Sequence, residues 1–403
     1  MAITFGSRGW RAFSKAKEST FDSAATINNI EGHIGSEPFN HVPDLTPDVD
    51  EVKGYEEATK QQDIAFNSTA EHRQRMTPNG LAQFLAFGLG NVSTVANEPA
   101  ATWYTHTFSP VPTTFASGAS LLDSASITVD DQVSFPSSGT LKFLSDGVTV
   151  AYSAKVSTNV FTVTPSHRAT VDNEAIALVD TLVPFEMPSM SVVEYYGIAS
   201  PQYLYTGVVV PKVGISVSRK QPAILEASML GSGTRATSAD ARPAFSGESF
   251  LKAGDLAIAT GGTWNGKTWG GATTTISAIV QSIIWEYMNQ FEADDGFGMG
   301  GGKVRTRAVR EGREQTLRPV LELTASTYLD LLTSQSTLTA RLLFTGSDNY
   351  KATFVFPELR MRAVPLSGGR GRIIQNAEFQ VAQEDNTCSV QVEVINKITG
   401  YHH

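Results

Sequence analysis

Cysteine, charge and long apolar runs are all scarce in this 403-residue chain. The single cysteine, Cys388, excludes an intramolecular disulfide and fits assembly in a reducing cytoplasm. It lies in the alternating run TCSVQVEVI, which predicts a buried strand thiol rather than a nucleophile. The most apolar run, ISAIVQSIIW, is interrupted by polar residues and is too short to cross a bilayer. The N-terminal MAITFGSRGWRAFSKAKE lacks the apolar stretch of a secretory signal, so we expect a soluble chain with no membrane segment.

Motifs that carry catalysis or hold a cofactor are also missing. The histidines form no HxH or HExxH pattern, and no GxSxG elbow occurs. The stretch DDGFGMGGGKVR is glycine-rich, but Phe297 stands where a phosphate-binding loop needs glycine and Val304 where it needs a hydroxyl. We therefore interpret it as a mobile loop, and we expect no enzyme activity, no cofactor and no metal. His106, in TWYTHTFSP, is predicted to be a strand histidine rather than a base.

The composition that remains is typical of β structure. Charged residues make up 18% of the chain, while Thr, Ser, Val, Ala and Gly are abundant. The net charge of −9 argues against a protein that grips a nucleic-acid duplex, since such a protein presents a basic face.

Residues 1–62 differ from the rest, because acidic residues and prolines gather between Glu31 and Asp63. Two interpretations stay open for this segment. One is a solvated disordered tail, which buries little apolar surface. The other is an extended N-terminal arm that lies on a neighbouring subunit and becomes ordered there.

Two short helices are predicted. Thr77 can cap the first, Pro78 suits its first turn, Leu81, Phe84 and Leu85 recur at helical spacing, and the glycines at 88 and 90 end it. We expect this helix to be amphipathic and to pack by its Leu/Phe face. The second helix, TYLDLLTSQS, is predicted to begin at a Ser326 cap and to flank the sheets.

Several long segments alternate between apolar and polar residues, which predicts half-buried strands. In KVGISVSRKQPAILEASML, one face of the predicted strand is aliphatic and consists of Val213, Ile215 and Val217. The other face is small and polar and consists of Gly214, Ser216 and Ser218. Residues 119–183 consist of shorter alternating runs and turns, which predicts a small inserted β domain. The fold class is therefore mainly β, an antiparallel β-sandwich with a flanking helix, formed by residues 63–118 and 184–403.

Basic residues follow the glycine-rich stretch and outnumber acidic ones from residue 303 to residue 372. Three interpretations are open: scattered solvated charge, a nucleic-acid surface, and a basic surface that meets the acidic arm of another copy. The third fits best, since stacking aromatics are absent from GGGKVRTRAVREGRE. The candidate contact residues between subunits or rings are Lys303, Arg305, Arg307, Arg310, Arg313, Asp48, Asp50 and Glu51.

The order of several segments resembles the tail tube proteins of long-tailed, siphophage-like bacteriophages. The segments are STAEHRQRMTPNGLAQFLAFGLG, ATWYTHTFSP, YLYTGVVVPKVGISVSRKQPAILEASMLGSG, TISAIVQSIIWEYMNQFEADDG, REQTLRPVLELTA and FPELRMRAVPLSG. The run FPSSGTLKFLSDGVTVAYSAKV is similar to a small β module of phage tail proteins. The resemblance covers residues 65–400 and rests on the order of patterns rather than on one motif.

The resemblance implies a structural virion protein that assembles in the host cytoplasm. Homo-hexameric rings would stack into a tail tube, and DNA would pass through its channel during ejection without sequence-specific binding. The implied partners are other copies of the chain, the tape measure protein, the tail terminator and the distal tail protein. The insert at 119–183 would lie on the outer surface of the tube.

Two alternatives remain for the function. One is another ring protein of the tail or baseplate, similar to a distal tail protein, which forms rings but no tube. The other is a carbohydrate-binding β module that uses the aromatic residues of TWNGKTWGG.

Overall fold

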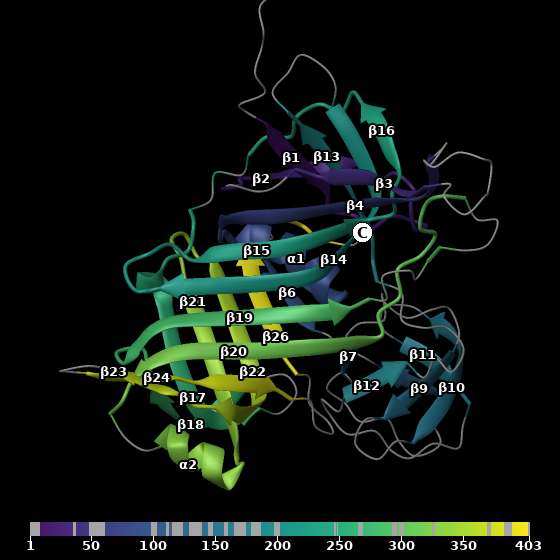
Figure 1. Cartoon of the computed structure of the whole chain (residues 1–403). Coiled ribbons are helices and arrows are strands. Elements are labelled where there is room, and N and C mark those ends of the chain that lie inside the picture. Colours follow the sequence, from purple (N-terminus) through teal and green to yellow (C-terminus); the bar gives the residue numbers. More distant parts are fainter. Residues whose placement is uncertain are drawn as a thin grey trace, which may run out of the picture.

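The chain is mainly β in the computed structural model, in which long strands dominate and two short α-helices interrupt them (Figure 1). This confirms the predicted fold class as mainly β, with large-scale antiparallel pairing. The structure describes residues 9–34, 38–47, 61–97, 103–109, 113–114, 124–128, 139–143, 148–156, 160–164, 175–178, 187–196, 202–245, 247, 249–264, 269–291, 296–297, 302–324, 327–368, 372–382 and 389–401.

One connected sheet of 20 strands forms the body of the molecule. Its first strands are β1 (Trp10–Ser14), β2 (Ile27–Glu31), β3 (Asn40–Pro47), β4 (Gln61–Arg75), β5 (Asn91–Ala96) and β6 (Tyr104–Ser109). The middle strands are β13 (Met190–Tyr195), β14 (Gln202–Ser218), β15 (Ile224–Gly231), β16 (Arg235–Ser238), β17 (Leu256–Trp264), β18 (Trp269–Thr275) and β19 (Val280–Gln290). The last are β20 (Gly312–Glu322), β21 (Thr337–Thr345), β22 (Lys351–Ala363), β23 (Leu366–Gly368), β24 (Ile373–Asn376), β25 (Glu378–Val381) and β26 (Gln391–Asn396).

This sheet folds back on itself to give two packed layers. The front layer runs in the order β3, β4, β15, β14, β19 and β20. The rear layer runs in the order β18, β17, β21, β22, β26, β6 and β5, and its strands cross behind the front ones (Figure 1). Trp285 of the front layer meets Phe354 of the rear layer edge to face, with ring centroids 5.3 Å apart. Apolar side chains between the layers form the main core.

Helix α1 (Pro78–Leu89) forms where the sequence predicts it. The Thr77 hydroxyl accepts a hydrogen bond from the Gly80 amide at 3.1 Å, and Gly90 ends the helix with a φ of 92°. The expectation that only one face of the helix is buried is wrong, however. All its residues are buried, because it contacts β14 and β15 on one side and β5, β6 and β26 on the other. The helix therefore lies inside the molecule.

Strand β14 belongs to two parts of the sheet. Its first half pairs with β13 and β16, and its second half pairs with β15 and β19. The change falls near Gly207, which has a φ of 61°. A side chain there would also approach Ser232 Cβ to 2.7 Å, so only glycine fits this turn without strain.

Strands β1, β2 and β3 pair within their own chain, so for these strands both interpretations, a disordered tail and a separate arm, are wrong. Strand β1 pairs with β13 and β2, and β3 pairs with β4. The turn that carries Glu18 is held in the same way, since its carboxylate accepts hydrogen bonds from Ser189 and Ser191 at 2.7 Å each. Local composition missed this docking because the partners lie more than 170 positions away in the sequence.

A second sheet of six strands lies within residues 113–178, in the order β7, β12, β9, β10, β11 and β8. Its strands are β7 (Thr113–Thr114), β8 (Ser126–Thr128), β9 (Gly139–Phe143), β10 (Thr149–Val156), β11 (Val160–Val163) and β12 (Ala175–Leu178). Phe143, Tyr152 and Phe161 belong to a small core of its own. The predicted boundaries of the insert, 119 and 183, stay predictions, but we note that β7 lies before the first of them.

Two short elements complete the chain. Helix α2 (Thr327–Ser334) lies where it is predicted, and its cap candidate Ser326 falls outside the described residues. Tyr328 is buried against the core, and Leu329 is partly buried beside it. The 3-10 helix η1 (Ala253–Asp255) precedes β17.

Candidate functional site

The outer face of the front layer is a broad, mainly polar surface whose residues the strand register aligns. On strands β4, β15, β14, β19 and β20 alternate residues turn away from the core, and the pairing aligns them in three rows. The first row is Arg75, Ile224, Ser216, Ile284 and Arg318. The second is Arg73, Glu226, Gly214, Glu286 and Thr316, and the third is Glu71, Ser228, Lys212, Met288 and Glu314.

The charges on this face are paired across neighbouring strands. Lys212 Nζ lies 2.6 Å from Glu286 Oε1, and Arg318 contacts the other oxygen of the same carboxylate. At the far side of the layer, Arg73 Nε lies 2.9 Å from Glu226 Oε1. Partial burial raises the pKa of Glu286, but the hydrogen bond and charge of Lys212 and the charge of Arg318 outweigh it. The pKa of Glu286 therefore lies below its ordinary value, and its carboxylate is ionised at neutral pH.

The three rows contain as many basic as acidic side chains, although the whole chain is acidic. Ion pairs and small residues such as Gly214 and Ser216 leave little unpaired charge and little bulk along the middle of the face. An arrangement of this kind is wettable and repels neither sign of charge strongly. Sequence alternation indicates the small polar side of β14, but only the register reveals which charges are neighbours.

The basic residues predicted as contacts lie in two different environments. Lys303, Arg307 and Arg313 are exposed. Arg305 is only 3% exposed, and its guanidinium lies 5.1 Å from the centre of the Phe297 ring. Buried in this way within its own chain, Arg305 is not available to a partner, so its predicted role is wrong.

Arg310 also points inward. It donates to the Tyr287 hydroxyl at 3.4 Å and to Asn289 Oδ1 at 3.3 Å, and burial lowers its pKa to about 10. Asn289 in turn donates to the carbonyl of Gly88 at 2.8 Å, close to the end of α1. Arg310 therefore supports the end of the helix; it is half-buried, and its contact role stays a prediction. The acidic candidates Asp48, Asp50 and Glu51 lie outside the described residues.

The glycine-rich stretch is anchored at both described ends. Gly296 has a φ of 89°, and its carbonyl accepts a hydrogen bond from the Thr306 amide at 2.9 Å. The Phe66 amide donates to the Lys303 carbonyl at 2.7 Å, which ties the return of the loop to β4. Within the stretch predicted to be mobile, residues 294–295 and 298–301 lie outside the described residues, so its mobility stays a prediction.

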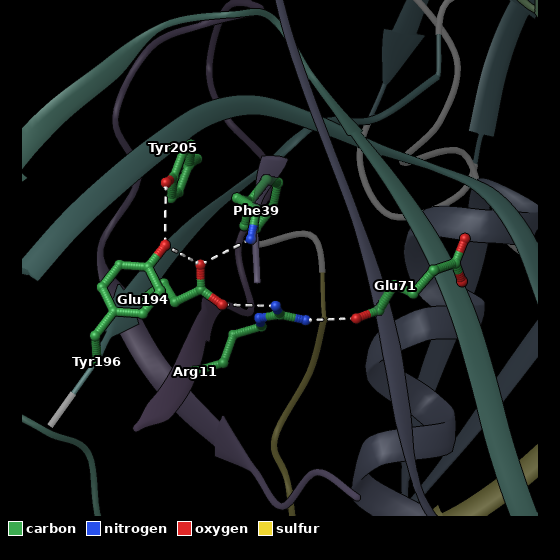
Figure 2. Close-up of polar contacts among 6 residues, drawn as sticks. All are labelled: Arg11, Phe39, Glu71, Glu194, Tyr196 and Tyr205. Atoms are coloured by element: carbon green, nitrogen blue, oxygen red, sulfur yellow. Dashed lines mark hydrogen bonds and ion pairs between the residues drawn. The ribbon is translucent and has the colours of Figure 1, made fainter. Parts of the chain in front are cut away.

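A buried ionic network fixes the N-terminal strands to the body of the molecule (Figure 2). Arg11 Nη2 lies 2.6 Å from Glu194 Oε1, and both side chains are almost fully buried. The second oxygen of Glu194 accepts from the Phe39 amide at 2.9 Å and from the Tyr196 hydroxyl at 2.7 Å. Burial is the main cause that raises the pKa of the Tyr196 phenol, which stays protonated and donates. The hydrogen bonds of this network all come from within the chain, so its role is structural.

The aromatic stretch of the carbohydrate-binding interpretation lies at the tip of the hairpin formed by β17 and β18. The Arg341 guanidinium lies 4.3 Å from the centre of the Trp269 ring and so covers one of its faces. The residues between Trp264 and Trp269 lie outside the described residues, so this interpretation stays a prediction.

His106 lies in strand β6, as predicted. It is fully buried and bonds Thr94 and Asn396 at 2.9 Å each. Within the described ranges, no group of three or more His, Cys, Asp or Glu side chains is arranged to hold a metal ion. No helix in the described part is long and apolar enough to span a membrane. Comparisons with known protein families and with curated proteins found no match to this chain.

Proposed function

We propose that this chain is the tail tube subunit of a long-tailed bacteriophage, whose rings stack into a channel for DNA. The observation that carries the proposal is the face of the front layer, which is broad, polar and balanced in charge. Its opposite side packs on the apolar core. A wall between a packed core and a water-filled passage needs one apolar side, which faces the core, and one polar side, which faces the water.

We further propose that the three rows of the front layer line this channel. DNA carries negative charge at every phosphate, so a basic lining would retain it and a strongly acidic lining would oppose its entry. A lining whose ion pairs are already satisfied, such as Lys212 with Glu286, does neither. The net charge of −9 argues against a protein that grips a duplex, and the three rows agree with this because their charges balance. The acidic excess of the chain therefore lies outside these rows.

Electron microscopy of the purified, concentrated protein tests the proposal directly. Hollow filaments or stacked rings are expected. Discrete rings that never stack would favour a distal tail or other baseplate ring protein. A monomer that binds glycans and forms no rings would overturn the proposal in favour of a carbohydrate-binding module.

Labelling tests which face lines the channel. In a Cys388→Ser background, Ser216→Cys places one thiol in the first row, at the centre of the front layer. We expect a bulky PEG-maleimide to label it in the monomer but not in the tube, while N-ethylmaleimide labels it in both. Equal labelling by the bulky reagent would place this face outside the tube. Protection from both reagents would place it in a subunit contact.

A further inference from the structure

The hairpin of β17 and β18 forms a wing that the described part of the chain leaves largely uncovered. Every residue from Gly270 to Thr275 is exposed, on both faces of the strand. Strand β17 pairs with β21 only from Leu256 to Thr260, so its later residues have β18 as their single described partner strand. Two-stranded hairpins are only marginally stable when no third strand or packed face supports them. A further strand paired to the edge of β18 would therefore stabilise the wing.

The edge of β18, which pairs only with β17 within the described residues, also lacks two of the features that protect edge strands. Its sequence, WGGATTT, contains neither charge nor proline. Four other edge strands of this sheet are protected: β3 contains Pro43 and Pro47, β2 ends with Glu31, β16 begins with Arg235, and β23 (Leu366–Gly368) is only three residues long. Because unprotected edges pair readily with other strands, this difference marks β18 as an edge kept open for pairing.

A matching edge lies at the other end of the same layer. Strand β5, with the sequence NVSTVA, also has no charge and no proline, and within the described residues it pairs only with β6. The rear layer thus begins and ends with uncharged, unprotected edges. A second copy of the chain can add its β5 to β18, and its own β18 then stays open for a third copy.

We infer that β18 of one copy pairs with β5 of the next, so that the rear layers of successive copies join edge to edge. The contact uses different surfaces on its two sides, so it repeats from copy to copy and gives a closed ring or an open filament. Backbone hydrogen bonds supply the attraction, and the small side chains of β18 let the neighbouring backbone approach. The inference deepens the proposed function, because it names one of the contacts between subunits.

Cysteine cross-linking tests the pairing. In a Cys388→Ser background, Thr274→Cys and Ala96→Cys are made in separate chains and mixed under mild oxidation. A covalent dimer of the two variants is expected. The matched control replaces Thr274→Cys by Thr345→Cys, which is also an exposed strand threonine but lies at the end of β21. Equal cross-linking by the control, or none by the Thr274 variant in assembled protein, would overturn the inference.

A variant that blocks the edge of β18 provides a second test of the pairing. Thr274→Lys places a charge on the open strand, and Thr345→Lys is its control. Sedimentation should show at least a tenfold weaker association for Thr274→Lys, with thermal unfolding of the monomer unchanged. Association as strong as that of the control, or a wild-type chain that stays monomeric when concentrated, would overturn the inference. Cross-linked assemblies without a hollow tube would instead contradict the proposed function and leave the strand pairing intact.

Discussion

At the scale of residues, the costliest feature is the charge buried where β1 meets β13. Arg11 and Glu194 are removed from water together, and each depends on the other for compensation. Such a pair adds little net stability compared with apolar residues, but it strongly opposes any other register of the N-terminal strand. The exposed pair of Arg73 and Glu226 carries no such cost.

We predict that Glu194→Gln destabilises the fold by about 3 kcal/mol, because it leaves the Arg11 guanidinium buried without a counter-charge. The matched control, Glu226→Gln, removes one partner of the exposed pair and should cost less than about 1 kcal/mol. Urea unfolding of the two variants measures both values. Equal losses would show that burial does not govern the cost.

A second prediction concerns acid. Burial lowers the pKa of His72 to about 3 from an ordinary 6.5, and the nearby Arg11 charge acts in the same direction. Between these two pH values the unfolded chain binds more protons than the folded chain, so stability falls as the pH falls. From pH 7 to pH 5 the loss due to His72 amounts to about 2 kcal/mol.

The His72→Gln variant isolates this effect, since glutamine stays polar beside Gln74 but does not titrate. Its unfolding free energy should change less between pH 7 and pH 5 than that of the wild type. Glu18, whose pKa burial raises, acts in the opposite direction in both proteins and cancels in the comparison. An identical pH dependence in the two proteins would contradict the prediction.

At the scale of elements, local patterns located the secondary structure well. The cap at Thr77 and the stop at Gly90 define α1, and the alternation of residues 280–290 defines β19. The register of the strands and the long-range contacts could not be predicted from the sequence, because they depend on side chains that are far apart in it. Arg310 illustrates this: nothing near it in the sequence indicates that Tyr287 and Asn289 receive its guanidinium.

The close packing of α1 gives a prediction at this scale. A β-carbon at Gly88 would approach Val213 Cγ2 of β14 to 2.6 Å. Gly88→Ala should therefore destabilise the fold by about 1–3 kcal/mol through overpacking, although alanine favours a helix by about 1 kcal/mol.

The Gly88→Ala, Val213→Ala double variant provides the control, because the shortened side chain of β14 makes room for the new methyl group. It should lose less stability than the sum of the two single variants. Strictly additive losses would mean that the two side chains do not collide.

At the scale of the whole molecule, two sheets with separate cores share one chain. The six-stranded sheet has its own apolar cluster around Phe143 and Phe161. The main core contains none of these residues. The two sheets are therefore expected to unfold as separate units.

We predict that replacing residues 119–183 with a short Gly/Ser linker leaves the main sheet folded. Calorimetry of the full chain should show two transitions, and the shortened chain should keep one of them at nearly the same temperature. Loss of both transitions in the shortened chain would show that the insert supports the main sheet.

The pairing of β26 with β6 and β22 bears on how the protein is made. His106 and Asn396, which share a hydrogen bond at 2.9 Å, are separated by 290 positions in the sequence. During translation, β6 leaves the ribosome long before its second partner strand, β26, exists, and α1 has only part of its cover in the meantime. The interior is sealed only after residue 396 emerges, so the main core is completed only when translation is nearly finished.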